Sequence, residues 1–211
     1  MNEWLSLHDF FYDINQKCEY LILRNWSALE NETPYMDGHE DIDILCNNLD
    51  HFLKVTGAKS IHYLDTRNNY SLLVGSNNVR LDVRFVGDGY YDSNWELTML
   101  HNRTLKHGFY TVSDEMFGYS IAYHALVHKP FLSSEYSSII SESLHIENDK
   151  DRIIEVLREY CAMNNYYATV PRDPGVHFNK KQAKIIGLKR DDYISINRFL
   201  FRLKLKLNCK V

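Results

Sequence analysis

Two aspartates, Asp41 and Asp43, flank a single isoleucine at the start of the segment DIDILC, which otherwise has the composition of a buried β-strand. Side chains alternate along a strand, so both carboxylates lie on one face while Ile42 and Ile44 lie on the other. Neighbouring carboxylates repel each other, and partial burial raises their pKa values unless a cation compensates. Mg²⁺ or Mn²⁺ takes such oxygen ligands and keeps room for water and phosphate. The pair therefore predicts a divalent metal site.

A second strand-like segment, VRLDVRFV, repeats this arrangement with both signs of charge. Arg80, Asp82 and Arg84 share one face of the predicted strand, and apolar residues occupy the other. An aspartate that holds metal, beside arginines that bind phosphate oxygens, suits a metal-bound phosphate. If Asp82 lies beside Asp41 and Asp43, three carboxylates converge and can hold two metals about 4 Å apart. The alternative is that the arginines only neutralise the aspartates on a solvated sheet face.

The elements that must position these residues follow from hydrophobic periodicity and turn signals. The first half predicts a mixture of two helices and five strands: helices at 3–17 and 48–57, and strands at 19–24, 41–46, 60–65, 70–75 and 79–86. Gly57 is a typical helix stop, and Ser113 is a predicted N-cap. The second half predicts helices at 113–129, 134–144 and 149–163, followed by a polar loop at 170–179 and a basic end.

The whole pattern predicts an α+β protein with a mixed β-sheet core. At 211 residues the chain is long enough for one good core with a smaller helical annex. We expect the sheet and its helices in residues 1–112, and a helical region packed on that core in residues 113–211. No internal repeat or low-complexity linker interrupts the sequence.

The segment 19–86 resembles the nucleotidyltransferase superfamily, which has the polymerase-β-like fold. Members carry an hGS-type turn after the first strand, then the aspartate pair, then a third aspartate on a later strand. Here LILRNWS occupies the place of the turn, and Ser27 precedes Asp41 by the spacing of the family. Trp26 stands where the family has its glycine. Haloacid-dehalogenase phosphatases and many sugar-nucleotide glycosyltransferases place an aspartate pair after an apolar strand. Here the apolar residues ILC follow the pair, which disfavours both families.

The region RNWSALE…GHEDIDILC is also similar to the LicD and fukutin group within this superfamily. Those proteins move phosphocholine or phospho-alditol groups from CDP-linked donors onto glycans. The resemblance implies a metal-dependent transferase that uses a nucleotide-linked donor and a hydroxyl acceptor such as a surface glycan. Separately, the cysteine usage and the acidic N-terminal segment predict a cytoplasmic protein.

The resemblance also assigns roles to individual residues. It implies that Asp41, Asp43 and Asp82 are the metal ligands and catalytic carboxylates, with Asp82 a candidate general base toward the acceptor hydroxyl. It implies that the donor phosphates contact polar residues of the turn and of the strand VRLDVRFV, namely Arg24, Asn25, Ser27, Arg80 and Arg84. Such chemistry depends mainly on positioning and charge neutralisation, which these residue types supply.

Three features outside that segment also contain polar residues. His124 and His128 are four apart on a predicted helix, with Lys129 beside them, but the glutamate of a zinc-protease motif is missing. We expect His128 and Lys129 to orient a donor phosphate or the acceptor, or else to be packed or solvated. The loop at 170–179 either shapes a pocket or is a surface turn. The basic end either contacts an anionic membrane surface or is a solvated helix.

Composition excludes several classes of protein. The net charge of −4 gives no support to a nucleic-acid-binding surface, so no DNA partner is expected. The N-terminal segment has acidic residues where a signal peptide has a basic region. The four cysteines form no Cys-x-x-Cys pair and indicate reduced thiols. Two alternatives stay open: a nucleotidyltransferase that modifies a small molecule, RNA or protein, and a catalytically silent nucleotide-binding module. The sequence does not fix the oligomeric state.

Overall fold

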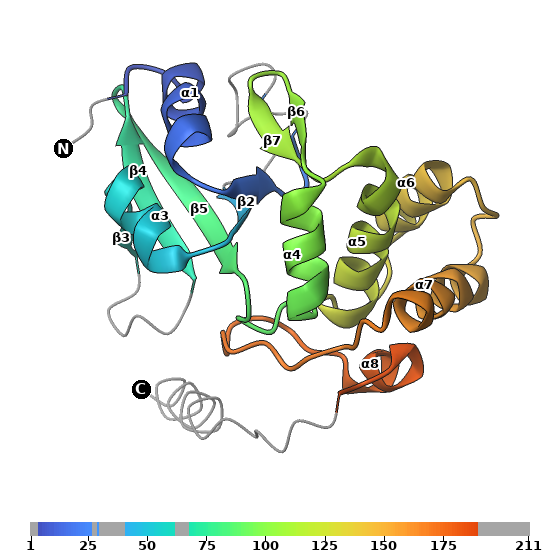
Figure 1. Ribbon diagram of the computed structural model, residues 1–211. Helices are drawn as coiled ribbons and strands as arrows, with labels where there is room; N and C mark the ends of the chain where they lie inside the picture. Colours follow the sequence, from blue (N-terminus) through green and yellow to red (C-terminus); the bar gives the residue numbers. More distant parts are fainter. Residues whose placement is uncertain (1–3, 27–28, 30–40, 62–67, 190–211) are drawn as a thin grey trace, which may run out of the picture. The chain divides into compact units, whose positions relative to one another are not determined.

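The structure is a computed structural model that describes residues 4–26, 29, 41–61 and 68–189 (Figure 1). The chain divides into two compact units, residues 1–86 with 95–117, and residues 87–94 with 118–211. Each unit is described by itself below. The described residues form seven helices and seven strands, so the protein is α+β, as predicted.

The first unit contains a mixed seven-stranded sheet in the order β3-β4-β5-β2-β1-β7-β6. Parallel pairs join β2 to β5 and β1 to β7, and the other neighbours are antiparallel. The strands are β1 (Tyr20–Ile22), β2 (Asp41–Cys46), β3 (Lys59–Ser60), β4 (Asn69–Val74), β5 (Asn77–Phe85), β6 (Thr104–Lys106) and β7 (Phe109–Thr111). Strand β2 therefore lies inside the sheet, between β1 and β5 (Figure 1).

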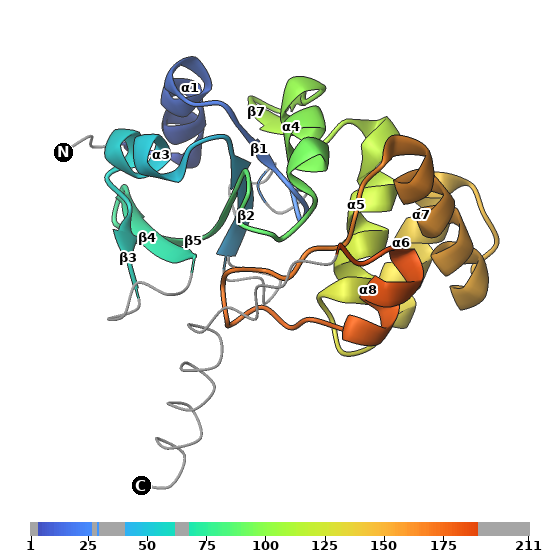
Figure 2. The ribbon, with the colours of Figure 1, turned by 60° about the horizontal axis from the view of Figure 1, so that its bottom comes forward.

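Two helices of the first unit cover one face of this sheet (Figure 2). Helix α1 (Leu7–Lys17) begins at the N-cap Ser6, and α3 (Leu49–Thr56) ends at Gly57, whose φ of 64° is the left-handed conformation predicted for a helix stop. Their apolar residues share one buried cluster with the inward side chains of β2 and β5. That cluster includes Phe10, Ile14, Phe52, Ile42, Ile44, Leu81 and Val83. The Asp41 and Asp43 side of β2 is the opposite face of the strand.

The second unit is helical, with α6 (Ser134–Leu144), α7 (Lys150–Asn164), α8 (Lys180–Ile186) and most of α5 (Asp114–Val127). Helix α5 is buried at every residue from Ser120 to Val127. It passes close to α6 at Gly118, where an added Cβ would lie 2.5 Å from the Leu144 side chain. The segment 87–94 joins this unit through backbone bonds such as Arg172 N–H to the Asp88 carbonyl, at 2.8 Å.

The sequence prediction missed the elements between residues 87 and 112. Helix α4 (Ser93–His101) lies there, followed by the hairpin of β6 and β7. The hairpin turn is His107-Gly108, with φ values of 51° and 89°. Two left-handed residues are the pattern of a type I′ turn, so the dipeptide was a usable hairpin signal.

Other predicted details have different outcomes. The α5 start agrees with the prediction, but the Ser113 hydroxyl makes no hydrogen bond within the described residues, so it is not a side-chain cap there. Cys18, Cys46 and Cys161 are buried free thiols. No helix in the described part of the chain has the length and apolar composition needed to cross a membrane. The basic end, Cys209 and most of the strand predicted at 60–65 lie outside the described residues.

Candidate functional site

The aspartates of β2 lie on the sheet face that α1 and α3 leave uncovered. Asp41 is exposed at the start of the strand, whereas Asp43 is only 6% exposed. Between and after them, Ile42 and Ile44 point into the core, because side chains alternate along a strand. The same alternation that builds the core thus forces both carboxylates onto one face.

Strand β5 brings the third aspartate beside this pair. The parallel register sets Asp43 opposite Asp82, Asp41 opposite Arg80 and Leu45 opposite Arg84. Paired residues of neighbouring strands project from the same face of a sheet. The condition stated from the sequence, that these two strands pair, is therefore met, and the face carries Asp41, Asp43, Asp82, Arg80 and Arg84.

Arginine side chains compensate the two inner carboxylates. Arg84 Nη2 lies 2.6 Å from Asp82 Oδ1 and donates to Asp82 Oδ2 at 2.8 Å. Arg24 Nη2 donates to Asp43 Oδ1, and both of these side chains are 7% exposed. Ion pairs removed from water to this degree are held by hydrogen bonds as well as by charge.

The segment after β1 delivers Arg24 to this position. Strand β1 runs antiparallel to β2, and Leu23 N–H donates to the Asp43 carbonyl at 2.9 Å, so the next residue starts beside Asp43. Asn25 then adopts a left-handed φ of 60° and its Nδ2 donates to Asp43 Oδ2 at 3.4 Å. Asparagine tolerates this conformation better than most residues.

The turn after β1 contains a left-handed residue, and that residue is Asn25. Trp26, which stands at the position of the family's glycine, has no positive φ. The Trp26 ring instead packs against Phe117, with ring centroids 4.5 Å apart. Ser27, the remaining predicted phosphate-binding residue of the turn, lies outside the described residues.

Asp43 is a carboxylate of this face with a raised pKa. The pKa of Asp43 is raised to about 7: burial raises it most, Arg24 acts against this, Asp82 and Asp41 add to the rise, and Arg84 lowers it. Desolvation outweighs the arginines because the carboxylate has almost no contact with water. A site of this kind is stabilised by an added positive charge.

The donor set is suited to Mg²⁺ or Mn²⁺, since it consists of carboxylate oxygens on adjacent strands in register. The described residues nevertheless contain no group of three or more His, Cys, Asp or Glu side chains arranged to hold a metal ion. Arg24 Nη2 contacts Oδ1 of Asp43, and Arg84 Nη2 contacts both oxygens of Asp82. In the described structure these two carboxylates are therefore compensated by arginines.

The predicted residues of α5 lie in the second unit. Both ring nitrogens of His128 meet backbone carbonyl oxygens, Nε2 at 2.8 Å from Tyr90 and Nδ1 at 3.1 Å from His177. His128 is 4% exposed, and its ring centroid is 4.0 Å from that of Tyr90. These contacts explain His128 as a packing residue of its unit. Lys129, beside it, is half-buried.

Another buried polar set in this unit was not predicted. His124 Nδ1 lies 2.5 Å from the Tyr90 hydroxyl, and its Nε2 lies 3.2 Å from the Tyr136 hydroxyl. Asp173, in the predicted polar loop, is 5% exposed and accepts a hydrogen bond from Gly175 N–H at 2.7 Å. An aspartate bonded two residues ahead stabilises a turn, which favours the turn interpretation of this loop.

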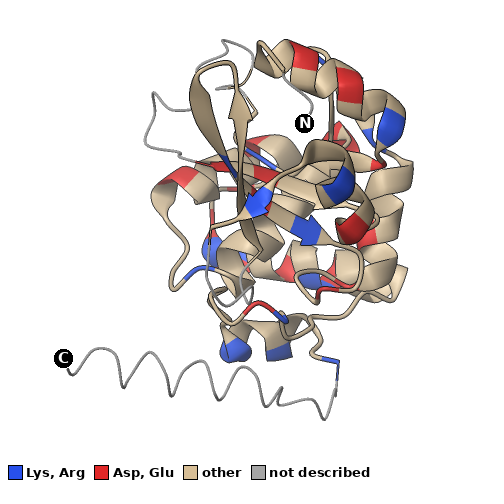
Figure 3. Cartoon of the chain, turned by 90° about the vertical axis from the view of Figure 1, so that its left-hand side faces the viewer, with Lys and Arg blue, Asp and Glu red and all other residues tan. Residues whose placement is uncertain are grey.

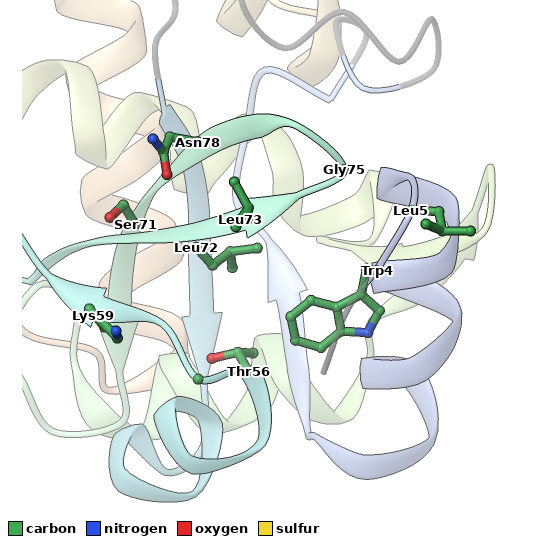
Figure 4. Close-up of a pocket in the computed structure, with 10 residues that line it drawn as sticks. Trp4, Leu5, Thr56, Lys59, Ser71, Leu72, Leu73, Gly75 and Asn78 are labelled. Carbon is green, nitrogen blue, oxygen red and sulfur yellow. The ribbon is translucent and has the colours of Figure 1, made fainter. Parts of the chain in front are cut away.

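One pocket of the first unit is lined by residues other than those of the candidate site. It has a volume of about 570 Å³ and lining residues from the start of the chain, the end of α3, and strands β3 to β5, among them Trp4, Thr56 and Leu72 (Figure 4). None of the predicted site residues lines it. Lys and Arg residues are interspersed with Asp and Glu residues along the described chain (Figure 3).

Comparisons with models of protein families, with curated proteins and with solved structures give no match for this chain. The functional interpretation therefore depends on the residues of β1, β2 and β5 themselves.

Proposed function

We propose that the protein is a metal-dependent transferase that moves a nucleotidyl or phospho-alditol group from a nucleotide-linked donor to a hydroxyl acceptor. The observation that supports this most is the parallel pairing of β2 with β5, which sets Asp43 opposite Asp82. A pair of buried or half-buried carboxylates on adjacent strands is electrostatically costly, and a divalent cation between them removes that cost.

In this proposal Asp41, Asp43 and Asp82 hold Mg²⁺ or Mn²⁺. The cation, when bound, neutralises charge on the phosphate and on the attacking and leaving oxygens. Asp82 is the candidate general base, since it adjoins Asp43 on the more exposed strand face. The acceptor hydroxyl loses its proton, its oxygen forms the new bond to phosphorus, and the nucleotide or pyrophosphate leaves with the electron pair of the broken P–O bond.

The arginines supply the donor contacts. Arg80 is exposed on the same face as the aspartates, opposite Asp41. Guanidinium groups bind phosphate oxygens through paired N–H donors, which orients the phosphate as well as attracting it. Asn25 lies in the turn that follows β1, and the family resemblance assigns Ser27 to the same phosphates, so we propose both as donor contacts. A CDP-linked alcohol and a nucleoside triphosphate both fit this charge pattern, and a surface glycan is the acceptor class that the family resemblance suggests.

A catalytically silent nucleotide-binding module is the second candidate. The ion pairs of Arg24 with Asp43 and of Arg84 with Asp82 favour it, because they compensate the carboxylates without a metal. The two candidates differ in one property: only the transferase needs the cation for donor binding.

A thermal-shift screen separates them. The protein is tested with CTP, ATP, UTP, GTP and CDP-alcohols, with and without Mg²⁺ or Mn²⁺, beside Asp43→Asn. The transferase predicts a metal-dependent shift for one donor that Asp43→Asn abolishes. A nucleotide shift that is independent of metal and survives in Asp43→Asn would favour the binding module.

A further inference from the structure

Arg24 forms an ion pair with Asp43, which is one of the proposed ligands of the cation. Its Nη2 donates to Asp43 Oδ1, the second oxygen of Asp43 lies 3.4 Å from Asn25 Nδ2, and Asp43 is 6% exposed. A carboxylate oxygen that ligates a metal does so at about 2.1 Å. Arg24 and a metal ion therefore compete for the same oxygen.

Arg24 is also better placed to leave than the neighbouring arginine. Arg84 belongs to β5, where the ladder with β2 fixes its backbone and Asp82 lies two residues away on the same face. Arg24 lies beyond the last residue of β1, in the bend that leads to Asn25. Its backbone, unlike that of Arg84, is therefore outside the regular ladder of the strands.

We propose that Arg24 is a resting counter-ion of Asp43 that exchanges with the divalent cation and then binds a phosphate of the donor. This inference rests on the proposed function of the same site. In the resting protein the guanidinium keeps the buried carboxylate compensated. When the cation takes Asp43, the guanidinium is released beside an incoming phosphate, which is the anion it binds best.

This exchange links the two ligands thermodynamically. The cation must displace Arg24, so its affinity for the protein alone is reduced. A phosphate that binds Arg24 removes the competitor, so anion and cation each strengthen the binding of the other by the same factor. Arg24 is thus a positioning residue that makes metal binding depend on the donor.

The test measures Mn²⁺ binding by electron paramagnetic resonance at pH 8, first in a Mn²⁺ titration without phosphate. Inorganic pyrophosphate, the phosphate probe, is then titrated with free Mn²⁺ held constant at a saturating concentration. For Arg24→Gln we expect Mn²⁺ affinity without pyrophosphate to rise about tenfold, because a competing positive charge is gone. We expect pyrophosphate affinity at saturating Mn²⁺ to fall about tenfold, because a guanidinium contact is lost. A purely structural role predicts that both affinities fall.

The control is Arg103→Gln, which removes the same charge from the first unit. Arg103 contacts Glu19 at 3.4 Å and stacks on the Tyr110 ring, and neither partner belongs to the site. The affinities of Arg103→Gln for Mn²⁺ and for pyrophosphate should equal those of the wild type. If Arg24→Gln fails to fold, Arg24→Lys decides the question, because lysine retains the charge but not the paired guanidinium donors. It should bind Mn²⁺ about threefold more tightly than the wild type.

The outcomes separate this inference from the function on which it rests. Mn²⁺ binding by the wild type with no gain in Arg24→Gln or Arg24→Lys would overturn the exchange and leave the metal site in place. An absence of Mn²⁺ binding in the wild type and every variant would overturn both.

Discussion

The substitution Asp43→Asn should stabilise the metal-free protein at pH 8, although it removes a proposed ligand. Asp43 is 6% exposed, and burial raises its pKa to about 7 from an ordinary value of 3.8. Asparagine has the same shape, keeps an oxygen that accepts from Arg24, and has no charge to desolvate. The cost of burying that charge is therefore absent from the variant.

The magnitude follows from the difference in pKa between the folded and unfolded chain. Each pKa unit is worth about 1.4 kcal/mol, so a rise from 3.8 to about 7 corresponds to about 4 kcal/mol of lost stability. Relaxation of the site and entry of water reduce such penalties, so we expect about 2 kcal/mol. For a chain of 211 residues this is a rise in Tm of about 4–8 °C.

The sign of the pH dependence is fixed by the same values. A carboxylate whose folded pKa is raised gives stability that is fully present below about pH 4 and is lost as the pH rises through about 7. The advantage of Asp43→Asn should thus be near zero at pH 4, grow between pH 4 and 7, and be constant above that range.

The assay is urea unfolding of both proteins in EDTA from pH 4 to 9, followed by circular dichroism. In Mg²⁺ at pH 8 the wild type should regain stability and Asp43→Asn should not, because only the wild type binds the cation to a charged carboxylate. An equal loss of stability in Asp43→Asn at all pH values would refute the reasoning. It would mean that the ion pair with Arg24, rather than desolvation, dominates the energy of Asp43.

Two further substitutions test other parts of the structure. Arg84→Gln should destabilise the metal-free protein by about 3 kcal/mol, since it leaves the Asp82 charge without the contacts of Arg84 Nη2. Mg²⁺ should restore part of the loss; unfolding in EDTA and in Mg²⁺ measures this, and equal losses in both would contradict it. Gly89→Ala should cost about 2 kcal/mol or more, because φ is 80° and the added Cβ would lie 2.6 Å from the Val170 carbonyl oxygen. Gly87→Ala, with φ of 85° and nothing within 4 Å of its added Cβ, should cost only about 1 kcal/mol in the same unfolding experiment, and equal costs would show that the Val170 contact has no effect.

Alternation along β2 and β5 made the candidate site predictable from sequence. Period-two patterns fix which side chains share a face, and a core on one side forces the charged residues to the other. The sequence pattern alone therefore assigns the aspartates and arginines of each strand to a single polar face. That β2 and β5 are neighbours, and that Asp43 lies opposite Asp82, are tertiary features that the alternation does not encode.

The contacts of Arg24 and His128 could not be predicted in the same way. Arg24 reaches Asp43 because β1 and β2 are antiparallel, and the order of strands in a sheet is a tertiary property that local patterns do not encode. The sequence left open whether His128 orients a donor phosphate or the acceptor or is packed, and backbone carbonyls from distant segments contact both of its ring nitrogens. The missed α4 has a weak amphipathic pattern, with Trp95, Glu96, Met99 and Leu100 all buried.

The central claim is that the aspartates of β2 and β5 bind a divalent cation together with a phosphate-containing donor. The most direct test is an anomalous difference map from crystals grown with Mn²⁺ and the nucleotide that gives the largest metal-dependent thermal shift. We expect a Mn²⁺ peak about 2.2 Å from carboxylate oxygens of Asp43 and Asp82, with the nucleotide phosphates beside it. A bound nucleotide with no Mn²⁺ peak between these strands, and with Arg24 still on Asp43, would contradict it.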